Sequence, residues 1–140
     1  MNRIRYLLDT DTCIFIRRHK PECVLARLSA VGLDAVALSA VTLYELAYGA
    51  EKHPHPVKAR EQLRRFLHPF QILPWSDQVA FECAKIRARL EIRGQMIGPY
   101  DVQIAAHARS HGLTVVTNNE GEFRRVDGLH LENWCTPPVP

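Results

Sequence analysis

The sequence predicts a three-layer α/β/α fold in which helices cover both faces of a mainly parallel sheet. Short apolar segments typical of buried strands alternate with longer segments whose apolar residues recur at helical spacing. A parallel crossover needs about a dozen residues and usually a helix, which matches this alternation. The chain has 140 residues and no internal repeat, so we expect a single domain over 1–140, with a proline-rich tail at 135–140.

In the first half of the chain, short apolar segments predict strands at 6–8 and 36–38. Apolar residues at helical spacing predict helices at 13–20, 23–32 and 39–50. The last of these begins at Ser39, a good N-cap residue, and is apolar on nearly every side, so we expect a central helix. Its only charge is Glu45, and a buried carboxylate requires a salt bridge or a function.

In the second half, helices are expected at 57–67, 79–94 and 99–112, and strands at 70–73, 114–116 and 129–131. Pro99 and Gly112 delimit the third of these helices. Asp101 lies in its first turn, at the head of an otherwise apolar stripe. Acids in a first turn also complement the helix dipole, so this position alone does not establish a function.

The composition is that of a globular protein, with 46% hydrophobic and 24% charged residues. We find neither an apolar run long enough to span a membrane nor a signal-type N-terminus, and therefore expect a cytoplasmic protein with no membrane partner. The four cysteines form no Cys-x-x-Cys pair, and we interpret them as reduced, buried side chains. Basic residues are grouped at 17–20, 58–65 and 87–93, which suits a polyanionic partner or solvated helix faces.

Polar side chains follow directly after three of the predicted strands. Asp9 follows the first strand and Ser39 the second, and Thr117 and Asn119 follow a later one. Ligands of parallel sheets bind beyond the carboxyl ends of the strands. We therefore expect these four residues to lie along one edge of the sheet.

Three carboxylates, those of Asp9, Glu45 and Asp101, are the candidate catalytic and metal-binding groups. If they meet in one cleft, their repulsion favours a bound cation, and oxygen ligands suit Mg²⁺ or Mn²⁺. Such a metal can polarise a phosphate and activate water, so no nucleophilic side chain is needed. The sequence indeed has no nucleophile elbow, phosphate-binding glycine loop or His-Glu-x-x-His helix. Asp9 taken alone, however, could simply cap the following helix.

Several segments together resemble the PIN-domain ribonuclease toxins of the VapC type. These are Leu7–Thr12, Ser39–Gly49, Gly98–Ala108 and Thr117–Asn119, followed by Phe123, Val126, Gly128-Leu129 and Glu132-Asn133-Trp134. The segments occur in the family order and span nearly the whole chain. The resemblance implies a PIN-like sandwich that cleaves RNA with Mg²⁺, a VapB-type antitoxin that blocks the site, homodimerisation, and contact with operator DNA only through the antitoxin. Several relatives of this length cut structured RNA such as the anticodon stem-loop of initiator tRNA.

The resemblance also assigns site residues. It implies that Asp9, Glu45 and Asp101 are the core acids, that Asn119 is the fourth catalytic position, and that Thr10, Asp11, Thr117, Glu120 and Glu122 are accessory candidates. Asn119 stands where many members have aspartate, and Asp11 where asparagine is common. Glu120 or Glu122 could supply the remaining charge, which leaves one or two metals open. The two threonines could orient a metal-bound water or satisfy nearby backbone groups.

Two other functions are consistent with parts of the sequence. Asp9-Thr10-Asp11-Thr12-Cys13 resembles the Asp-x-Asp-x-Thr signature of haloacid-dehalogenase-type phosphatases, in which Asp9 would be the nucleophile and Asp11 the acid/base. That signature fails at Cys13 and leaves Glu45 unexplained. A non-catalytic RNA- or antitoxin-binding module, with acids that only stabilise the fold through a metal, would also suit the basic groups.

Overall fold

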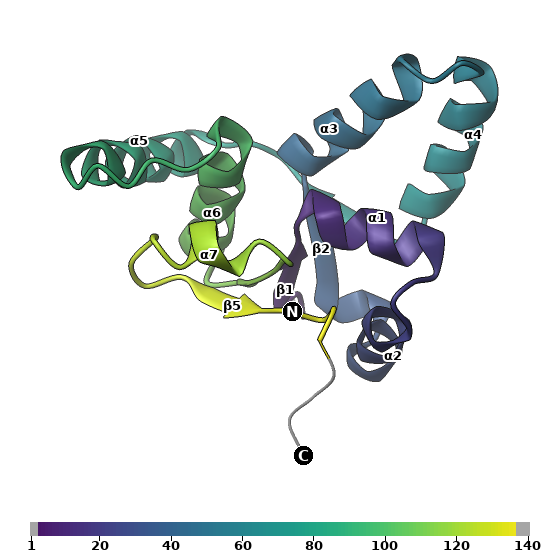
Figure 1. Cartoon of the computed structure of the whole chain (residues 1–140), viewed down its shortest axis with the longest axis horizontal. Helices are drawn as coiled ribbons and strands as arrows, with labels where there is room; N and C mark the ends of the chain where they lie inside the picture. Colours follow the sequence, from purple (N-terminus) through teal and green to yellow (C-terminus); the bar gives the residue numbers. More distant parts are fainter. Residues whose placement is uncertain (1–2, 137–140) are drawn as a thin grey trace.

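The computed structural model describes residues 3–136 and has a five-stranded, entirely parallel sheet with helices on both faces (Figure 1). The strand order is β3-β2-β1-β4-β5. The strands are β1 (Tyr6–Leu8), β2 (Val36–Ser39), β3 (Gln71–Leu73), β4 (Thr114–Val116) and β5 (His130–Glu132). The predicted α/β/α architecture is confirmed, and the strand bounds differ from the predicted ones by a single residue at most.

The helices that connect the strands also agree with the prediction. They are α1 (Thr10–Arg18), α2 (Glu22–Val31), α3 (Ala40–Glu51), α4 (Pro56–Leu67), α5 (Asp77–Ile92), α6 (Pro99–His111) and α7 (Glu120–Phe123), with a 3₁₀ turn, η1 (Leu33–Ala35). Helix α1 begins three residues earlier than predicted because the Asp9 side chain caps it by accepting a hydrogen bond from the Thr10 amide. The sequence did not reveal α7 or η1, since one turn is too short to show a period.

Two apolar cores lie on opposite faces of the sheet. In β1 the neighbours Leu7 and Leu8 are both fully buried, but they belong to different cores, because successive side chains of a strand point to opposite faces. Leu8 is in register with Leu38 of β2 and with Val116 of β4. The central strand β1 is therefore packed on both faces and paired with a strand on each side. This packing also fixes the position of Asp9, which directly follows β1.

The expectation that α3 is a central, buried helix is wrong. Tyr44 and Tyr48 are 55% and 57% exposed, and Glu45 is half-buried. Helix α3 packs on α4, and the two extend together away from the sheet (Figure 1). The apolar sequence was misleading because a tyrosine can keep one side of its ring in solvent while its neighbours pack. Glu45 therefore faces the edge of the sheet rather than the core.

The four cysteines are free, as expected, but only Cys13 is fully buried, while Cys23, Cys83 and Cys135 are partly exposed. The prediction that all are core residues is therefore wrong for three of them. Within residues 3–136, we find no helix long and apolar enough to cross a membrane. Positions 137–140 of the predicted proline-rich tail lie outside the described residues. That the whole chain is one domain stays a prediction.

Candidate active site

Three neighbouring strands end in polar residues at the same edge of the sheet, as predicted: Asp9 after β1, Ser39 in β2 and Thr117 after β4. Asp9 is in the middle and only 4% exposed. One of its carboxylate oxygens accepts a hydrogen bond from the Thr10 amide (2.7 Å), and the other accepts one from the Thr117 hydroxyl (2.8 Å). Asp9 therefore caps α1 and is also held rigidly at the mouth of the site.

Glu45 is connected to Asp9 through Thr10. The Thr10 hydroxyl donates to Glu45 Oε1 at 2.8 Å and lies 3.5 Å from the hydroxyl of the buried Thr42. Thr10 is in the first turn of α1, and Glu45 is in the middle of α3. This contact brings the second predicted acid beside the first, although 35 residues separate Thr10 from Glu45 in the chain.

Asp101 lies in the first turn of α6, where Asn119 contacts it. The Asn119 side-chain amide donates to Asp101 Oδ2 at 3.3 Å and also to Glu122 of α7. The Asn119 backbone amide donates to the Thr117 hydroxyl at 2.9 Å, and this hydroxyl in turn donates to Asp9. Asn119 thus connects Asp101 to the Asp9 side of the site, and Glu122 lies beside both Asn119 and Asp101.

The remaining accessory candidates occupy different places. Asp11 accepts a hydrogen bond from the Asn118 amide at 3.1 Å, so it braces the loop after β4. Glu120 accepts from Asn133 at 3.1 Å and forms a surface ion pair with Arg124 at 3.3 Å. Of the two glutamates in α7, Glu122 rather than Glu120 contacts the predicted site residues. The sequence alone did not distinguish between them.

Burial is the main cause that raises the pKa of Asp9, Asp11 and Asp101. Burial raises the pKa of Asp9 to about 7, with further contributions from the charges of Asp11 and Asp101. The pKa of Asp101 is also raised to about 7, first by burial and then by its hydrogen bond and charge interaction with Glu122. Burial likewise raises the pKa of Asp11. Within residues 3–136, neither these acids nor Glu45 take part in a salt bridge.

A cluster of uncompensated carboxylates is a favourable place for a divalent cation, and a donor set made only of oxygens fits Mg²⁺ or Mn²⁺. In the described part of the chain, however, no three His, Cys, Asp or Glu side chains are arranged closely enough to hold a metal ion. The threonine and asparagine contacts connect the acids, but they do not arrange three of them as a metal site. The assignment of Asp9, Glu45 and Asp101 as ligands stays a prediction.

Two residues outside the predicted set of site residues also shape the site. A Cβ atom on Gly98 would lie 3.3 Å from Asp101 Oδ2, so the absence of a side chain at this position leaves room for the acid. His107 is fully buried on α6, and its Nδ1 lies 2.7 Å from the Ser39 hydroxyl, which also caps α3 at the Val41 amide. Burial lowers the pKa of His107 to about 4, as expected of a neutral structural contact between α6 and α3. In the sequence, only the Gly98-Pro99 pair at the start of α6 could have indicated the role of Gly98.

Comparisons with known proteins identify the family of this chain. The family model described as "PIN domain" matches residues 6–129. The chain is 41% identical over 132 residues to the tRNA(fMet)-specific endonuclease VapC of Salmonella typhimurium, covering 94% of this chain and 99% of the relative. The chain belongs to the PIN-domain family. It is also 38% identical to ribonuclease VapC2 of Haemophilus influenzae (strain Rd), covering 94% of this chain and 98% of the relative.

Solved structures place this PIN domain within the same group. A crystal structure of DNA-bound VapBC from Salmonella typhimurium superposes with a TM-score of 0.89 at 41% identity, covering 94% of this chain and 99% of that one. VapBC2 from Rickettsia felis, bound to a promoter DNA fragment, gives 0.87 at 33% identity, covering 94% and 99%. The predicted resemblance to VapC-type ribonucleases is confirmed, and PIN-domain nucleases are in general metal-dependent.

The PIN assignment does not favour the two alternative functions. In the phosphatase hypothesis Asp11 would serve as the acid/base, but its carboxylate accepts hydrogen bonds from the Asn118 amide and the Thr12 hydroxyl and braces a loop. The hypothesis also gives Glu45 no role, whereas the structure places it against Thr10, next to Asp9. A module that only binds RNA or an antitoxin is not favoured either, since the matched relatives are named as nucleases.

Proposed function

We propose that this VapC-type PIN-domain ribonuclease is a Mg²⁺-dependent endoribonuclease and the toxin of a toxin-antitoxin pair in the cytoplasm. The observation that carries the proposal is the uncompensated acid cluster at the carboxyl edge of the sheet, with Asp9 and Asp101 raised in pKa to about 7. An RNA phosphodiester is the substrate class, and tRNA is the first candidate because one relative is named a tRNA(fMet)-specific endonuclease.

In this proposal Asp9, Glu45 and Asp101 hold the cation, for which Mn²⁺ is a second candidate. A cation held there would supply polarisation of the scissile phosphate and activation of the attacking water. The chain's own contribution is to fix the acids: Thr117 orients Asp9, Thr10 orients Glu45, and Asn119 orients Asp101. Because each acid is held by a neutral donor rather than by a cation, its charge remains available to the metal.

We further propose that the partner is a VapB-type antitoxin that covers the active site, that operator DNA is contacted only through this antitoxin, and that the toxin is a homodimer. The first two proposals are supported by two neighbouring solved structures, both of which are VapBC complexes bound to DNA. The oligomeric state is measured directly by light scattering on the purified toxin. A monomer at micromolar concentration would contradict the dimer.

The decisive experiment is incubation of the purified protein, freed of any bound partner, with total tRNA and Mg²⁺. We expect discrete fragments that disappear when EDTA removes the metal and return when Mg²⁺ is added back in excess. Sequencing the fragment ends identifies the target. If neither total tRNA nor total cellular RNA is cut under conditions in which the protein is folded, the proposed function is wrong.

The two glutamates of α7 provide a matched pair of variants. Glu122→Gln is expected to lower RNA cleavage by about tenfold or more, because Glu122 contacts Asn119 and Asp101, and residues that orient metal ligands have effects of this size. Glu120→Gln removes the same charge two residues away but disturbs only contacts with Asn133 and Arg124, so cleavage should stay within about twofold of the wild type. Initial rates on one RNA at saturating Mg²⁺ compare them, and equal effects would contradict the placement of Glu122.

A further inference from the structure

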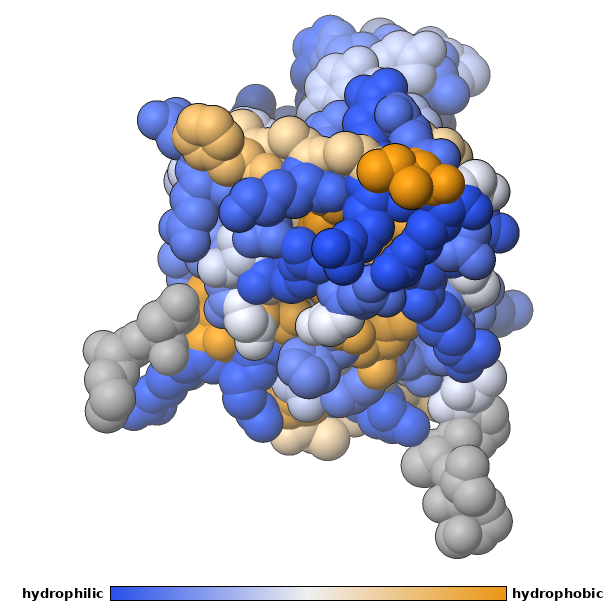
Figure 2. Space-filling view, turned by 90° about the vertical axis from the view of Figure 1, so that its left-hand side faces the viewer, coloured by the Kyte–Doolittle hydropathy of each residue, from blue (hydrophilic) through white to orange (hydrophobic). Residues whose placement is uncertain are grey.

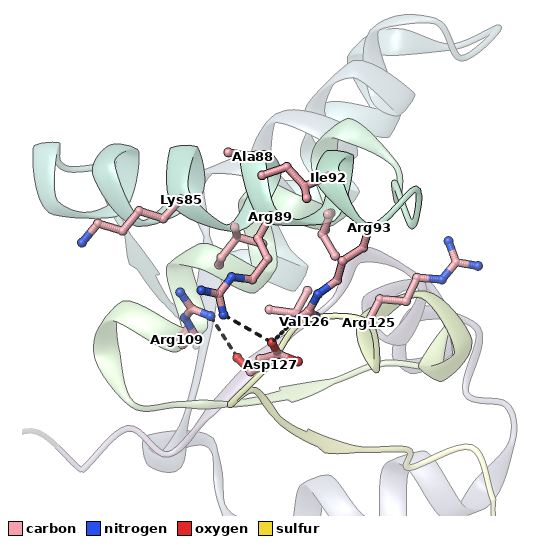
Figure 3. A pocket seen from close by; sticks show the side chains of 11 residues that line it. Lys85, Ala88, Arg89, Ile92, Arg93, Arg109, Arg125, Val126 and Asp127 are labelled. Carbon is pink, nitrogen blue, oxygen red and sulfur yellow. Dashed lines mark hydrogen bonds and ion pairs between the residues drawn. The ribbon is translucent and has the colours of Figure 1, made fainter.

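A basic groove lies outside the acid cluster, between α5 and the turn that follows α7 (Figure 3). Its volume is about 580 Å³, and its floor is apolar, formed by the buried Ile86, Leu90 and Val126. Five of its lining side chains are cationic, namely Lys85, Arg89, Arg93, Arg109 and Arg125, and only Asp127 is acidic. Figure 2 faces the end of the molecule where α5 lies and shows strongly hydrophilic side chains there, with apolar surface visible between them.

Three of these cations form a row. Lys85 and Arg89 of α5 and Arg93, its C-cap residue, are spaced four residues apart, so they lie on one face of the helix at intervals of about 6 Å. In Figure 3 the two arginines point from α5 toward the turn at Asp127. A straight row of positive charges of this kind matches a backbone that carries one negative charge at each repeat, as RNA does.

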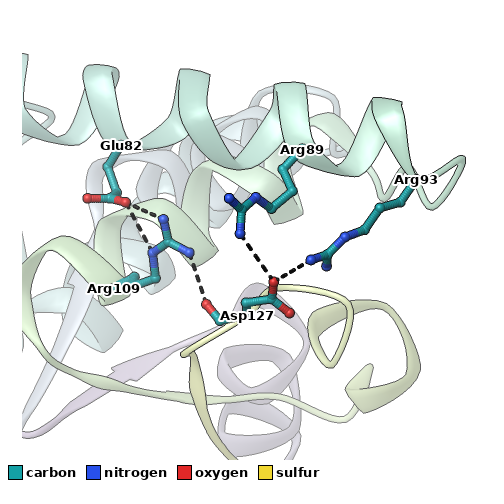
Figure 4. A network of polar contacts seen from close by, with 5 residues as sticks. All are labelled: Glu82, Arg89, Arg93, Arg109 and Asp127. Carbon is teal, nitrogen blue, oxygen red and sulfur yellow. Dashed lines mark hydrogen bonds and ion pairs between the residues drawn. The ribbon is translucent and has the colours of Figure 1, made fainter.

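A polar network holds the arginines in the groove (Figure 4). The Asp127 carboxylate pairs with Arg93 at 2.7 Å and with Arg89 at 3.6 Å, and its backbone carbonyl accepts a hydrogen bond from Arg109 at 2.9 Å. Arg109 is also paired with Glu82. The Arg89 and Arg93 side chains remain 66% and 40% exposed, and exposed pairs contribute little to stability. One carboxylate thus orders two guanidinium groups that stay accessible to a ligand.

Arg125 connects the lining of the groove to the candidate active site. The Arg125 guanidinium donates at 2.8 Å to the carbonyl of Met96, in the loop that leads to Gly98 and Asp101. The Arg125 backbone amide donates at 3.0 Å to the carbonyl of Glu122, whose side chain contacts Asn119. Arg125 therefore belongs to the groove lining and also contacts two segments that carry site residues.

We propose that this basic groove binds the phosphate backbone of the RNA substrate on one side of the cleavage site, with Arg125, Arg93 and Arg89 as successive contacts. The proposal rests on the proposed function, because it treats the acids as the place where RNA is cut. Arginine is suited to phosphates because its planar guanidinium donates several hydrogen bonds at once. An acidic protein segment would also complement the positive charge of the groove. RNA is favoured because Arg125 connects the groove to the acids at which RNA would be cut.

The test measures RNA binding and cleavage separately. In an Asp9→Asn background, which is not expected to cut, Arg89→Gln/Arg93→Gln should weaken binding of a labelled 20-nucleotide RNA by about tenfold and flatten its salt dependence by roughly 0.7 per lost contact. The control is Arg60→Gln/Arg65→Gln on α4, at the other end of the molecule, where both arginines also pair with surface glutamates. This control should bind like the parent.

Two further measurements make the result decisive. Asp127→Asn removes the only acid of the groove lining and should tighten RNA binding, whereas a loss equal to that of the arginine variant would show a purely structural role. If the arginine variant binds RNA like the control but loses affinity for the antitoxin, the groove is a protein-binding site and the proposal is overturned. A wild type that binds through the groove but cuts no RNA would instead contradict the proposed function alone.

Discussion

Asp9→Asn is expected to abolish RNA cleavage and, at the same time, to make the metal-free protein more stable at pH 8. The loss of activity should exceed about 100-fold, because a neutral amide replaces the central carboxylate of the proposed metal site. The gain in stability follows from burial: Asp9 is 4% exposed, with no basic partner among the described residues, so its charge is costly to bury. Asparagine keeps the shape and still caps a helix well, so Thr10 retains its capping partner.

The size of the gain follows from the pKa. A raised pKa of about 7 in the fold, against 3.8 for the ordinary group, corresponds to a penalty on the order of 2–4 kcal/mol above pH 7. Part of it will be offset by the weaker contact between Asn and Thr117, so a net increase of about 1–3 kcal/mol in the free energy of unfolding is expected. Thermal and urea unfolding in EDTA measure it. Asp34→Asn, an exposed aspartate at the opposite edge of the sheet, is the control and should change neither property.

Local sequence patterns predicted the elements of this fold but not their exposure. Strand and helix positions followed from apolar spacing, and the convergence of Asp9, Ser39 and Thr117 followed from the parallel topology alone. The orientation of α3 could not be predicted in this way. Some apolar side chains of α3 contact the sheet, others contact α4, and two tyrosines are exposed. The sequence does not say which of these side chains is buried and which is exposed.

The contacts within the site were also beyond the sequence. That Thr10 would hold Glu45, or that Asn119 would contact Asp101, depends on the distance between α1, α3 and α6, which is set by core packing. In the sequence Glu122 is one of several charged candidates. Its contact with Asn119 depends on the short helix α7, which the sequence pattern does not reveal. Residues far apart in the chain that meet through such contacts leave no spacing pattern to recognise.

The second large effect concerns pH and metal. Asp9 and Asp101 both have folded pKa values of about 7, above the 3.8 of the ordinary group. Between about pH 4 and pH 7 the folded protein therefore binds more protons than the unfolded chain at these positions, so their contribution to stability falls as the pH rises. Above pH 7 the full penalty is present, and a divalent cation can relieve it by taking the place of the protons. Mg²⁺ should accordingly stabilise the protein at pH 8 and have little effect at pH 5.

Unfolding curves at pH 5 and pH 8, each with EDTA and with 10-fold steps of Mg²⁺, test this coupling. We expect a rise in melting temperature of several degrees at pH 8 that grows with the logarithm of the Mg²⁺ concentration, as binding to the folded state alone requires. In Asp9→Asn/Asp101→Asn this rise should be largely lost, and the variant without metal should already be more stable than the wild type at pH 8. Since other groups titrate in both proteins, the difference between their pH profiles isolates the two acids. A Mg²⁺ effect of equal size in the double variant would place the cation elsewhere. If the wild type instead gains stability relative to the variant as the pH rises, the charges of the two carboxylates are already compensated within the fold.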